Sequence, residues 1–146
     1  MSFENEIVCL NKLPPFLILL HCSKNKITNL DNLPFGLLEL WCDSNKISRL
    51  DNLPYGLKIL SCYQNGIKRL DNLPYTLLQL WCNDNSIECM DNLFCDLQIL
   101  AFSNNLITRL NKFPQSLVEL YCESNPLIYK FKPTIRKIKK YNSKFR

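Results

Sequence analysis

A 20-residue pattern recurs six times along this 146-residue chain, and it constrains the fold more than any other feature. Its clearest copy is Leu37–Gly56, which returns with the same fixed positions at Leu57–Thr76. The spacing stays at 20 residues from Leu17 to Asn125 without an insertion. A fixed period of this length is typical of repeat architectures, in which each unit packs only on its neighbours. The sequence therefore predicts a solenoid of stacked coils.

Each copy contributes one residue to several fixed columns. Two leucine columns begin at Leu17 and Leu20, a cysteine column begins at Cys22, an asparagine column at Asn25 and an isoleucine column at Ile27. Side chains two residues apart on a strand share a face, so Leu20 and Cys22 indicate a short strand with an inward apolar face. Stacked strands of this kind form a parallel sheet with a spacing of about 4.8 Å. We expect the asparagine amide to bond backbone groups of its own and the adjacent coil.

The spacing L-x-x-L-x-C-x-x-N-x-I resembles the leucine-rich-repeat signature from residue 5 to about residue 130. The bias towards Asn, Lys and Ile, the cysteine column and the Leu-Asp-Asn-Leu-Pro motif are similar to leucine-rich-repeat proteins of giant amoebal (mimivirus-like) DNA viruses. The 20-residue period and the Leu-Pro return segment resemble, more distantly, bacterial type III effector repeats. The resemblance implies an α/β repeat solenoid with a parallel β-sheet on its concave face, and binding of proteins in a host cell.

The chain is expected to form one leucine-rich-repeat domain over residues 1–146. Residues 1–16 read as a truncated N-terminal repeat, 17–126 as the repeats, and 127–146 as a basic C-terminal cap or tail. Pro34 and its equivalents favour an extended, polyproline-like convex side with little helix. The truncated repeat lacks a strand, and it is expected to add three apolar side chains to the core: Ile7, Leu10 and Leu13.

Three stretches depart from the pattern. Asn92–Asp96 lacks the proline of the other copies and predicts a local irregularity. Pro126–Phe131 is expected to add one last edge strand. Pro133–Tyr141 is expected to form a short helix, with proline at its start and an apolar residue at every third position. Its apolar stripe would cover the last repeat while its lysines face water.

The eight cysteines are read as thiols without disulfides. Five of them occupy the cysteine column and are predicted to be buried: Cys22, Cys42, Cys62, Cys82 and Cys122. The other three lie outside it and are predicted to be exposed: Cys9, Cys89 and Cys95. Tetrahedral zinc needs ligands that converge on one point, whereas this column predicts a row, so no metal and no cofactor are expected. With an acidic start at Met1–Glu6 and no long apolar run, the chain reads as cytoplasmic, in the host cell if it is viral.

No catalytic constellation is recognisable, and we expect no enzyme. The one histidine, His21, falls on the free face of the predicted sheet, and three glycines cannot build a phosphate-binding loop. The resemblance to effectors could suggest a ubiquitin ligase, but such enzymes carry a separate catalytic domain with its own cysteine. No part of the 146 residues is left over for such a domain.

Charge is distributed unevenly along the chain. Residues 1–125 hold all 13 acidic side chains and 10 of the 18 basic ones, which gives −3. Residues 126–146 hold eight Lys or Arg and no acid, which gives +8. The tail reads as a capping helix with a solvated face, or as a contact for nucleic acid or anionic membrane through Lys137, Lys139 and Lys140.

The free face of the predicted sheet carries three further columns. They are named by their position in the copy that begins at Leu17: the third column starts at Leu19, the fifth at His21 and the seventh at Ser23. The side chains of all three columns alternate in chemistry from copy to copy. The repeating unit of this face is therefore 40 residues, either because a partner selects it or because a two-repeat block was once duplicated. Exposed apolar surface marks partner sites, and Trp and Tyr are favoured anchors. The candidate partner-binding residues are Leu19, Glu39, Trp41, Asp43, Ile59, Tyr63, Gln79, Trp81, Asn83, Ile99, Glu119 and Tyr121.

The most favoured function is a non-enzymatic module that binds a protein through its concave sheet. One alternative is a self-associating structural protein, because the edge strand near Leu19 is expected to have only residues 1–16 over it and exposed edges invite pairing. A homodimer would form through that edge or through the aromatic face. The other alternative is an adaptor for nucleic acid or anionic membrane that acts through the basic tail.

Overall fold

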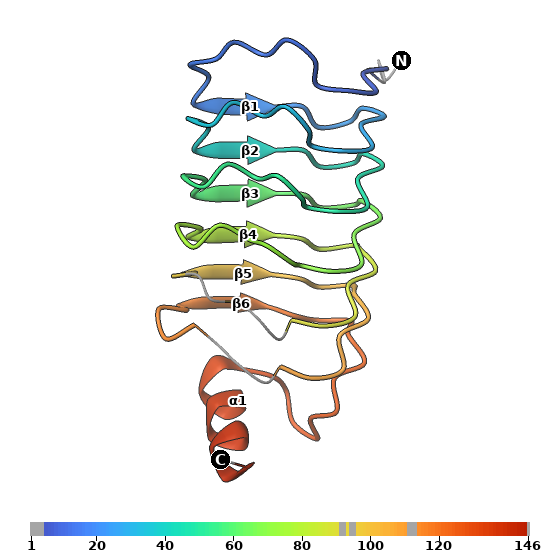
Figure 1. The fold of residues 1–146 in the computed structure, drawn as a ribbon. Coiled ribbons are helices and arrows are strands. Elements are labelled where there is room, and N and C mark those ends of the chain that lie inside the picture. Colours follow the sequence, from blue (N-terminus) through green and yellow to red (C-terminus); the bar gives the residue numbers. More distant parts are fainter. Residues whose placement is uncertain (1–4, 91–92, 94–95, 111–113, 146) are drawn as a thin grey trace.

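The computed structural model describes residues 5–90, 93, 96–110 and 114–145 of the chain. Six short strands stack in chain order as one parallel sheet, and the coils follow each other like the turns of a spring (Figure 1). The strands are β1 Leu19–His21, β2 Glu39–Trp41, β3 Ile59–Ser61, β4 Gln79–Trp81, β5 Ile99–Ala101 and β6 Glu119–Tyr121. The predicted α/β repeat solenoid with a parallel sheet is confirmed.

The register of the sheet equals the sequence period. Leu20 pairs with Leu40, and every other paired residue likewise faces the residue 20 positions later. Backbone bonds continue the ladder beyond the strands, because the N–H of Cys22 donates to the carbonyl of Trp41 at 2.8 Å. An unbroken 20-residue period therefore places each column of the sequence in a straight line along the stack.

The inward columns form one continuous core. Leu40, Cys42 and Ile47 of the second coil are fully buried, whereas Leu20 of β1 and Leu120 of β6 are half-buried because each has a neighbouring strand on one side. All five cysteines of the cysteine column are buried, as predicted. Cys9 and Cys89 are exposed, also as predicted, and Cys95 lies outside the described residues.

The asparagine column bonds the backbone of two coils at once. The amide nitrogen of Asn65 donates to the carbonyls of Cys42 and Cys62, both at 3.1 Å, and to that of Tyr63 at 3.2 Å. Its amide oxygen accepts the N–H of Ile47 at 3.0 Å. This is the arrangement expected from the sequence, and it satisfies backbone groups that the turn would otherwise leave buried and unpaired.

The convex side consists of turns and extended chain. In the return segments that contain the proline, a turn closes where its carbonyl accepts the N–H three residues on, as from Leu37 to Pro34 at 3.1 Å. Asn52 and Asn72 have φ of 63° and 60°, a left-handed conformation that asparagine tolerates better than most residues. No helix occurs among the described residues between 17 and 126, in agreement with the prediction. The irregularity predicted at Asn92–Asp96 falls mostly outside the described residues.

The predicted edge strand at Pro126–Phe131 is wrong, because the described chain forms no strand there. In earlier coils the residue after the asparagine donates its N–H to the preceding coil, as Lys46 does to Ile27 at 2.9 Å. Pro126 occupies this position and has no N–H to donate, but residues 46–51 form no strand either, although Lys46 makes this bond. The residues that follow the asparagine therefore lie past the strand in every described coil.

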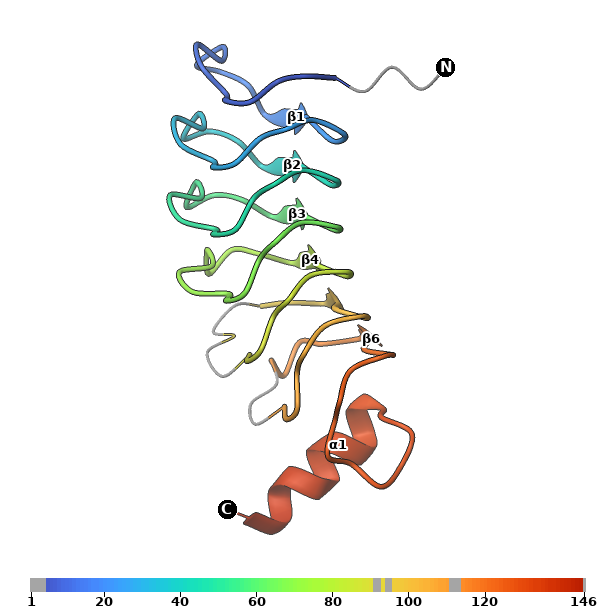
Figure 2. The same cartoon turned by 90° about the vertical axis from the view of Figure 1, so that its right-hand side faces the viewer.

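A C-terminal helix packs beneath the last coil instead. Helix α1 spans Ile135–Asn142, begins at the N-cap Thr134, and continues as the short 3-10 helix η1 at Ser143–Phe145. Figure 2 shows α1 beyond β6, at the end of the stack. Ile138 is fully buried against the core. The predicted short helix is confirmed, one to two residues later than expected.

The truncated N-terminal repeat is less closed than the sequence indicated. Leu10 is buried and Leu13 is half-buried against the core, as expected. Ile7 is 48 % exposed, so its predicted place in the core is wrong. Its counterpart Ile27 is fully buried because coils pack on both sides of it, whereas the described chain places a coil on one side of Ile7.

Candidate protein-interaction face

Two aromatic pairs cover the concave face of the sheet. The ring of Trp41 stacks on His21 with centroids 5.5 Å apart, and the ring of Trp81 stacks on Tyr121 with centroids 6.0 Å apart. Strands β4 and β6 are two strand spacings apart, about 9.6 Å. The rings of Trp81 and Tyr121 therefore lean toward each other across β5, and Ala101 beneath them is fully buried.

Small residues between the rings explain the alternation of the fifth column. Ser61 and Ala101 occupy this column on β3 and β5, and both are buried although they point to the free face. A larger side chain at Ala101 would occupy the space into which Trp81 and Tyr121 lean. The 40-residue unit of this face thus has a packing cause, since each small residue makes room for the large neighbours on adjacent strands.

The third column flanks these rings with apolar and polar side chains. Ile59 and Ile99 are half-buried, and Leu19 is 42 % exposed. The hydroxyl of Tyr121 donates to Glu119 Oε2 at 2.9 Å, and this bond raises the pKa of Tyr121.

The two tryptophans differ in hydrogen bonding. Trp81 Nε1 donates to Gln79 Oε1 at 3.5 Å. Trp41 Nε1 is buried and has no hydrogen-bond partner among the described residues, although Glu39 holds the position equivalent to Gln79. Replacing Trp41 by Phe therefore removes no hydrogen bond that the structure describes.

The seventh column bonds one coil to the next. The N–H of Asp43 donates to Ser23 Oγ at 3.1 Å, that of Tyr63 to Asp43 Oδ1 at 2.9 Å, and that of Ser103 to Asn83 Oδ1 at 2.8 Å. Asp43 Oδ1 also accepts the hydroxyl of Ser61 at 2.5 Å. These side chains accept hydrogen bonds from backbone N–H groups just past the strands. Asp43 and Asn83 therefore have a structural role in addition to any contact with a partner.

The twelve candidate residues lie on one face, and the two tryptophans among them belong to separate aromatic pairs. Trp41 belongs to the pair near β1, whereas Trp81 and Tyr121 belong to the pair near β6. The two pairs are separated by β3, where Ser61 is buried and Ile59 is half-buried. Tyr63, 39 % exposed, lies on the same coil just past that strand.

This face is acidic on a chain whose net charge is +5. The third, fifth and seventh columns contribute eighteen residues, among which there is no Lys or Arg. The face has four carboxylates: Glu39, Asp43, Glu119 and Glu123. The hydroxyl of Ser103 donates to Glu123 Oε2 at 2.8 Å, and this bond is the largest cause of the lowered pKa of Glu123.

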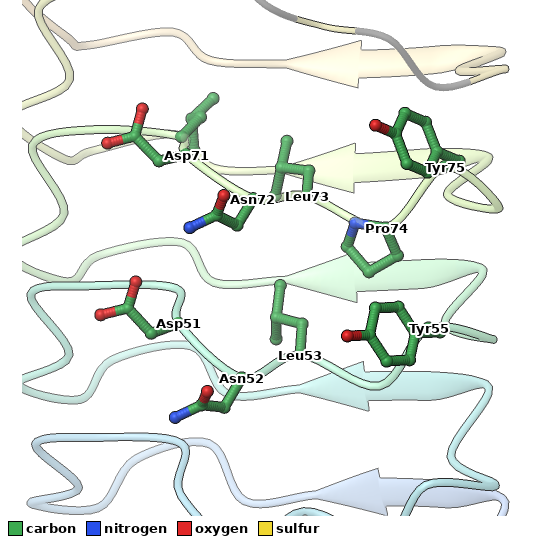
Figure 3. A pocket seen from close by; sticks show the side chains of 10 residues that line it. Asp51, Asn52, Leu53, Tyr55, Asp71, Asn72, Leu73, Pro74 and Tyr75 are labelled. Carbon is green, nitrogen blue, oxygen red and sulfur yellow. The ribbon is translucent and has the colours of Figure 1, made fainter.

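The convex side has an aromatic column that sequence reasoning missed. Phe35, Tyr55 and Tyr75 each follow the proline of a return segment and are 83 %, 91 % and 73 % exposed. Figure 3 shows the two tyrosines one above the other beside an open hollow, with Asp51 and Asp71 at its other end. The signal was present in the sequence, since a Leu-Pro-aromatic triplet stands in three consecutive copies.

Each aspartate beside the hollow is paired with an arginine of its own coil. Arg49 Nε lies 2.7 Å from Asp51 Oδ2, and Arg69 Nε lies 2.7 Å from Asp71 Oδ2. All four side chains are well exposed, so these pairs contribute little to stability. They leave the convex hollow with little net charge.

The C-terminal helix separates its apolar and basic residues. Ile138 is buried against the core, whereas Arg136, Lys137 and Lys140 are exposed and Lys139 is half-exposed. Tyr129 and Asn142 fix this segment to the last coil, because the Tyr129 hydroxyl accepts the N–H of Leu110 at 3.0 Å and Asn142 Nδ2 donates to the Leu110 carbonyl at 2.6 Å.

Two kinds of feature are absent from the described part of the chain. No group of three or more His, Cys, Asp or Glu side chains is arranged there to hold a metal ion. Among the same residues, no helix is both long and apolar enough to cross a membrane.

Comparison with known proteins gives structural relatives. No protein-family model matches the chain, and no curated protein matches it. A Shigella effector LRR domain is 32% identical with a TM-score of 0.76, over 86% of this chain and 56% of that one. YopM from Yersinia enterocolitica is 33% identical with a TM-score of 0.68, over 85% and 32% of the two chains. YopM from Yersinia pestis, described as a leucine-rich effector protein, is 29% identical with a TM-score of 0.74, over 83% and 34%.

These relatives support the fold that the repeat signature implied. The chain has the leucine-rich-repeat fold and is similar to the repeat domains of bacterial effectors. It spans between about a third and just over half of the length of these solved structures.

Proposed function

We propose that this leucine-rich-repeat solenoid is a non-enzymatic module that binds a protein partner through the concave face of β1–β6. The observation that carries the proposal is the pair of aromatic stacks, His21–Trp41 and Trp81–Tyr121, held on a rigid sheet. Large aromatic side chains on a preformed surface lose little conformational entropy on binding and are favoured as interface anchors. The similarity to the repeat domains of effectors supports the same class of function.

A pull-down with matched aromatic variants tests this proposal. The Trp41→Ala/Trp81→Ala double variant removes one ring of each stack from the concave face. The Tyr55→Ala/Tyr75→Ala double variant removes two exposed rings from the convex side and serves as the control. We expect the first variant to lose the partner that the wild-type protein captures, and the second to retain it. Capture by both variants would contradict the assignment of the concave face.

We further propose that the protein works in a reducing cytoplasm, and in that of a host cell if the likeness to giant-virus proteins reflects its origin. Five buried cysteines in a row support a reducing compartment, since each fills the core as a thiol. The likeness to giant-virus proteins rests on the bias towards Asn, Lys and Ile, the cysteine column and the Leu-Asp-Asn-Leu-Pro motif.

A second candidate function is an adaptor that contacts nucleic acid or anionic membrane through Lys137, Lys139 and Lys140. The observation in its favour is that Ile138 anchors α1 while the basic side chains around it stay at the surface. A Lys137→Gln/Lys140→Gln variant keeps the anchor and removes two exposed charges. If this function is correct, binding to duplex DNA or to phosphatidylserine vesicles falls in the variant and falls with added salt for the wild type. Equal binding by both proteins would rule it out.

A further inference from the structure

The concave face differs in charge from the chain that carries it. Eight cations without an acid in residues 126–146 give the chain its positive charge, yet the eighteen face positions hold four carboxylates and no Lys or Arg. Such a face repels polyanions and attracts cations. Of the macromolecules that a repeat sheet could bind, it therefore favours a basic protein segment over nucleic acid.

The carboxylates stand beside the aromatic rings. Residues two positions apart on a strand project to the same side, so Glu39 lies next to Trp41 on β2, and Glu119 next to Tyr121 on β6. The intervening β4 carries Gln79 beside its tryptophan and has no charge at that position. The face thus has two acidic aromatic positions, separated by a neutral one.

Hydrogen bonds within the chain show which carboxylates are available. Asp43 accepts bonds from Ser61 and from the N–H of Tyr63, and Glu123 accepts one from Ser103. The position of Glu119 is set by the hydroxyl of Tyr121, which occupies one of its oxygens and leaves the other without a bond to that ring. Glu39 on β2 and Glu119 on β6 are therefore the carboxylates best placed to receive a cation.

We propose that the concave face binds an extended, basic protein segment with two cationic side chains six residues apart. One cation would lie at Trp41 and Glu39, and the other at Tyr121 and Glu119. This inference rests on the proposed function and specifies the chemical class of its ligand.

The spacing follows from the sheet. Strands β2 and β6 are four strand spacings apart, about 19 Å at about 4.8 Å each. An extended segment that crosses the strands advances about 3.3 Å per residue and covers this distance in about six residues. Residues an even number apart in an extended chain point to the same side, so both cations reach the face. A helix would need about thirteen residues to cover the same distance, at about 1.5 Å each.

Arginine fits these positions better than lysine. Its planar guanidinium group stacks on an aromatic face and at the same time donates two parallel bonds to a carboxylate. The ammonium group of lysine is a point charge and cannot do both with the same geometry. We therefore expect arginine peptides to bind more tightly than lysine peptides of the same spacing.

Fluorescence anisotropy with labelled synthetic peptides tests the inference. The probe is a short peptide of Ser and Val with two arginines six positions apart, and its control has the same composition with the arginines three positions apart. We expect the probe to bind about tenfold more tightly than the control. Glu39→Gln and Glu119→Gln should each weaken the probe about three- to tenfold, because each removes one charged contact at a partly exposed site. Glu88→Gln, which removes an exposed carboxylate outside the face columns, should leave binding unchanged.

Charge reversal gives an independent test. A Glu39→Lys/Glu119→Lys variant should reject the arginine probe and prefer a peptide with two glutamates at the same spacing. Circular dichroism checks that each variant keeps its sheet. Equal binding of the probe and its control, or unchanged binding in both Gln variants, would overturn the inference.

A neutral apolar peptide separates this inference from the proposed function. If that peptide binds, loses binding in the Trp41→Ala/Trp81→Ala variant, and outcompetes the arginine probe, the concave face is a protein site but the basic ligand class is wrong. If no peptide binds and the pull-down partner is retained by the same variant, both proposals fail.

Discussion

Replacing Asn65 with alanine tests how the coils are held together. Asn65 lies in the third coil, with the asparagine column continuing on both sides of it. Its side chain takes part in four hydrogen bonds, three donated to carbonyls and one accepted from the N–H of Ile47. Alanine removes all four and leaves the strands and the leucine columns in place.

The energetic cost is concentrated in one of those four bonds. Without Asn65, the carbonyl of Cys42 still accepts from Asn45 at 3.0 Å, and that of Cys62 from Asn85 at 3.0 Å. The N–H of Ile47 loses the one partner that the structure gives it, inside a residue that is fully buried. A buried donor left without an acceptor costs about 1–3 kcal/mol, so we expect the free energy of unfolding to fall by about 2 kcal/mol.

Urea denaturation followed by circular dichroism measures this change, and Asn25→Ala provides the matched control. Asn25 accepts the N–H of Ile7 at 3.1 Å, but Ile7 is 48 % exposed. Water can replace the lost acceptor there, so Asn25→Ala should cost less than about 1 kcal/mol. The comparison of Asn65→Ala with Asn25→Ala therefore separates the cost of a buried, unpaired N–H from the cost of losing the asparagine amide.

Equal losses of stability in the two variants would refute this reasoning, because they would show that the buried N–H is not the source of the cost. An unchanged midpoint for Asn65→Ala would refute the structural role of the column altogether. A change in the slope against urea would indicate that the solenoid unfolds in parts after the substitution, as repeat proteins do when one interface weakens.

Three further predictions concern the thiols, the helix and self-association. Burial raises the pKa of the Cys22 and Cys122 thiols to about 11 from the ordinary 9.0, so the free energy of unfolding should fall between pH 9 and 11, where only the unfolded thiols ionise. An alkylating reagent should reach the cysteine column only on unfolding, and fast labelling of the native column would contradict this. Ile138→Ala should lower the free energy of unfolding by about 2–4 kcal/mol in thermal melts, and Lys140→Ala should not; equal melting temperatures would show that α1 is no cap. The exposed apolar residues near β1 predict a concentration-dependent dimer in sedimentation experiments, which Ile18→Glu should abolish; a wild-type monomer at every concentration would disprove it.

The columns could be predicted from the sequence because the period never changes. An unbroken 20-residue spacing leaves one way to align Leu20 with Leu40, and the structure adopts it. The buried cysteine column and the short helix near Ile138 follow from the same logic, since both depend on the period of apolar residues. The edge strand expected at Pro126–Phe131 is absent because these residues occupy the positions after the asparagine, which form no strand in any described coil.

The candidate face was located by pattern, but its geometry was not. Alternation placed Trp81 and Tyr121 on the free side, yet it could not show that their rings lean together over Ala101. That arrangement depends on the rotamers that the neighbouring side chains permit. Likewise, the pattern marked Asp43 as a candidate contact for a partner, whereas its oxygens also accept bonds from both adjacent coils. The sequence pattern assigns Asp43 to a column of the face, but the hydrogen-bond partners of its oxygens are seen only in the structure.

The pairing of each strand residue with the residue 20 positions later has a mechanical consequence. The truncated N-terminal repeat and α1 lie at opposite ends of the stack (Figure 1), so a force applied between the chain ends acts along the line of the sheet's hydrogen bonds. Each strand is three residues long and bonds only its immediate neighbours. Under tension the solenoid should therefore unfold from one end, one coil at a time. Each step would release 20 residues, about 70 Å of extended chain.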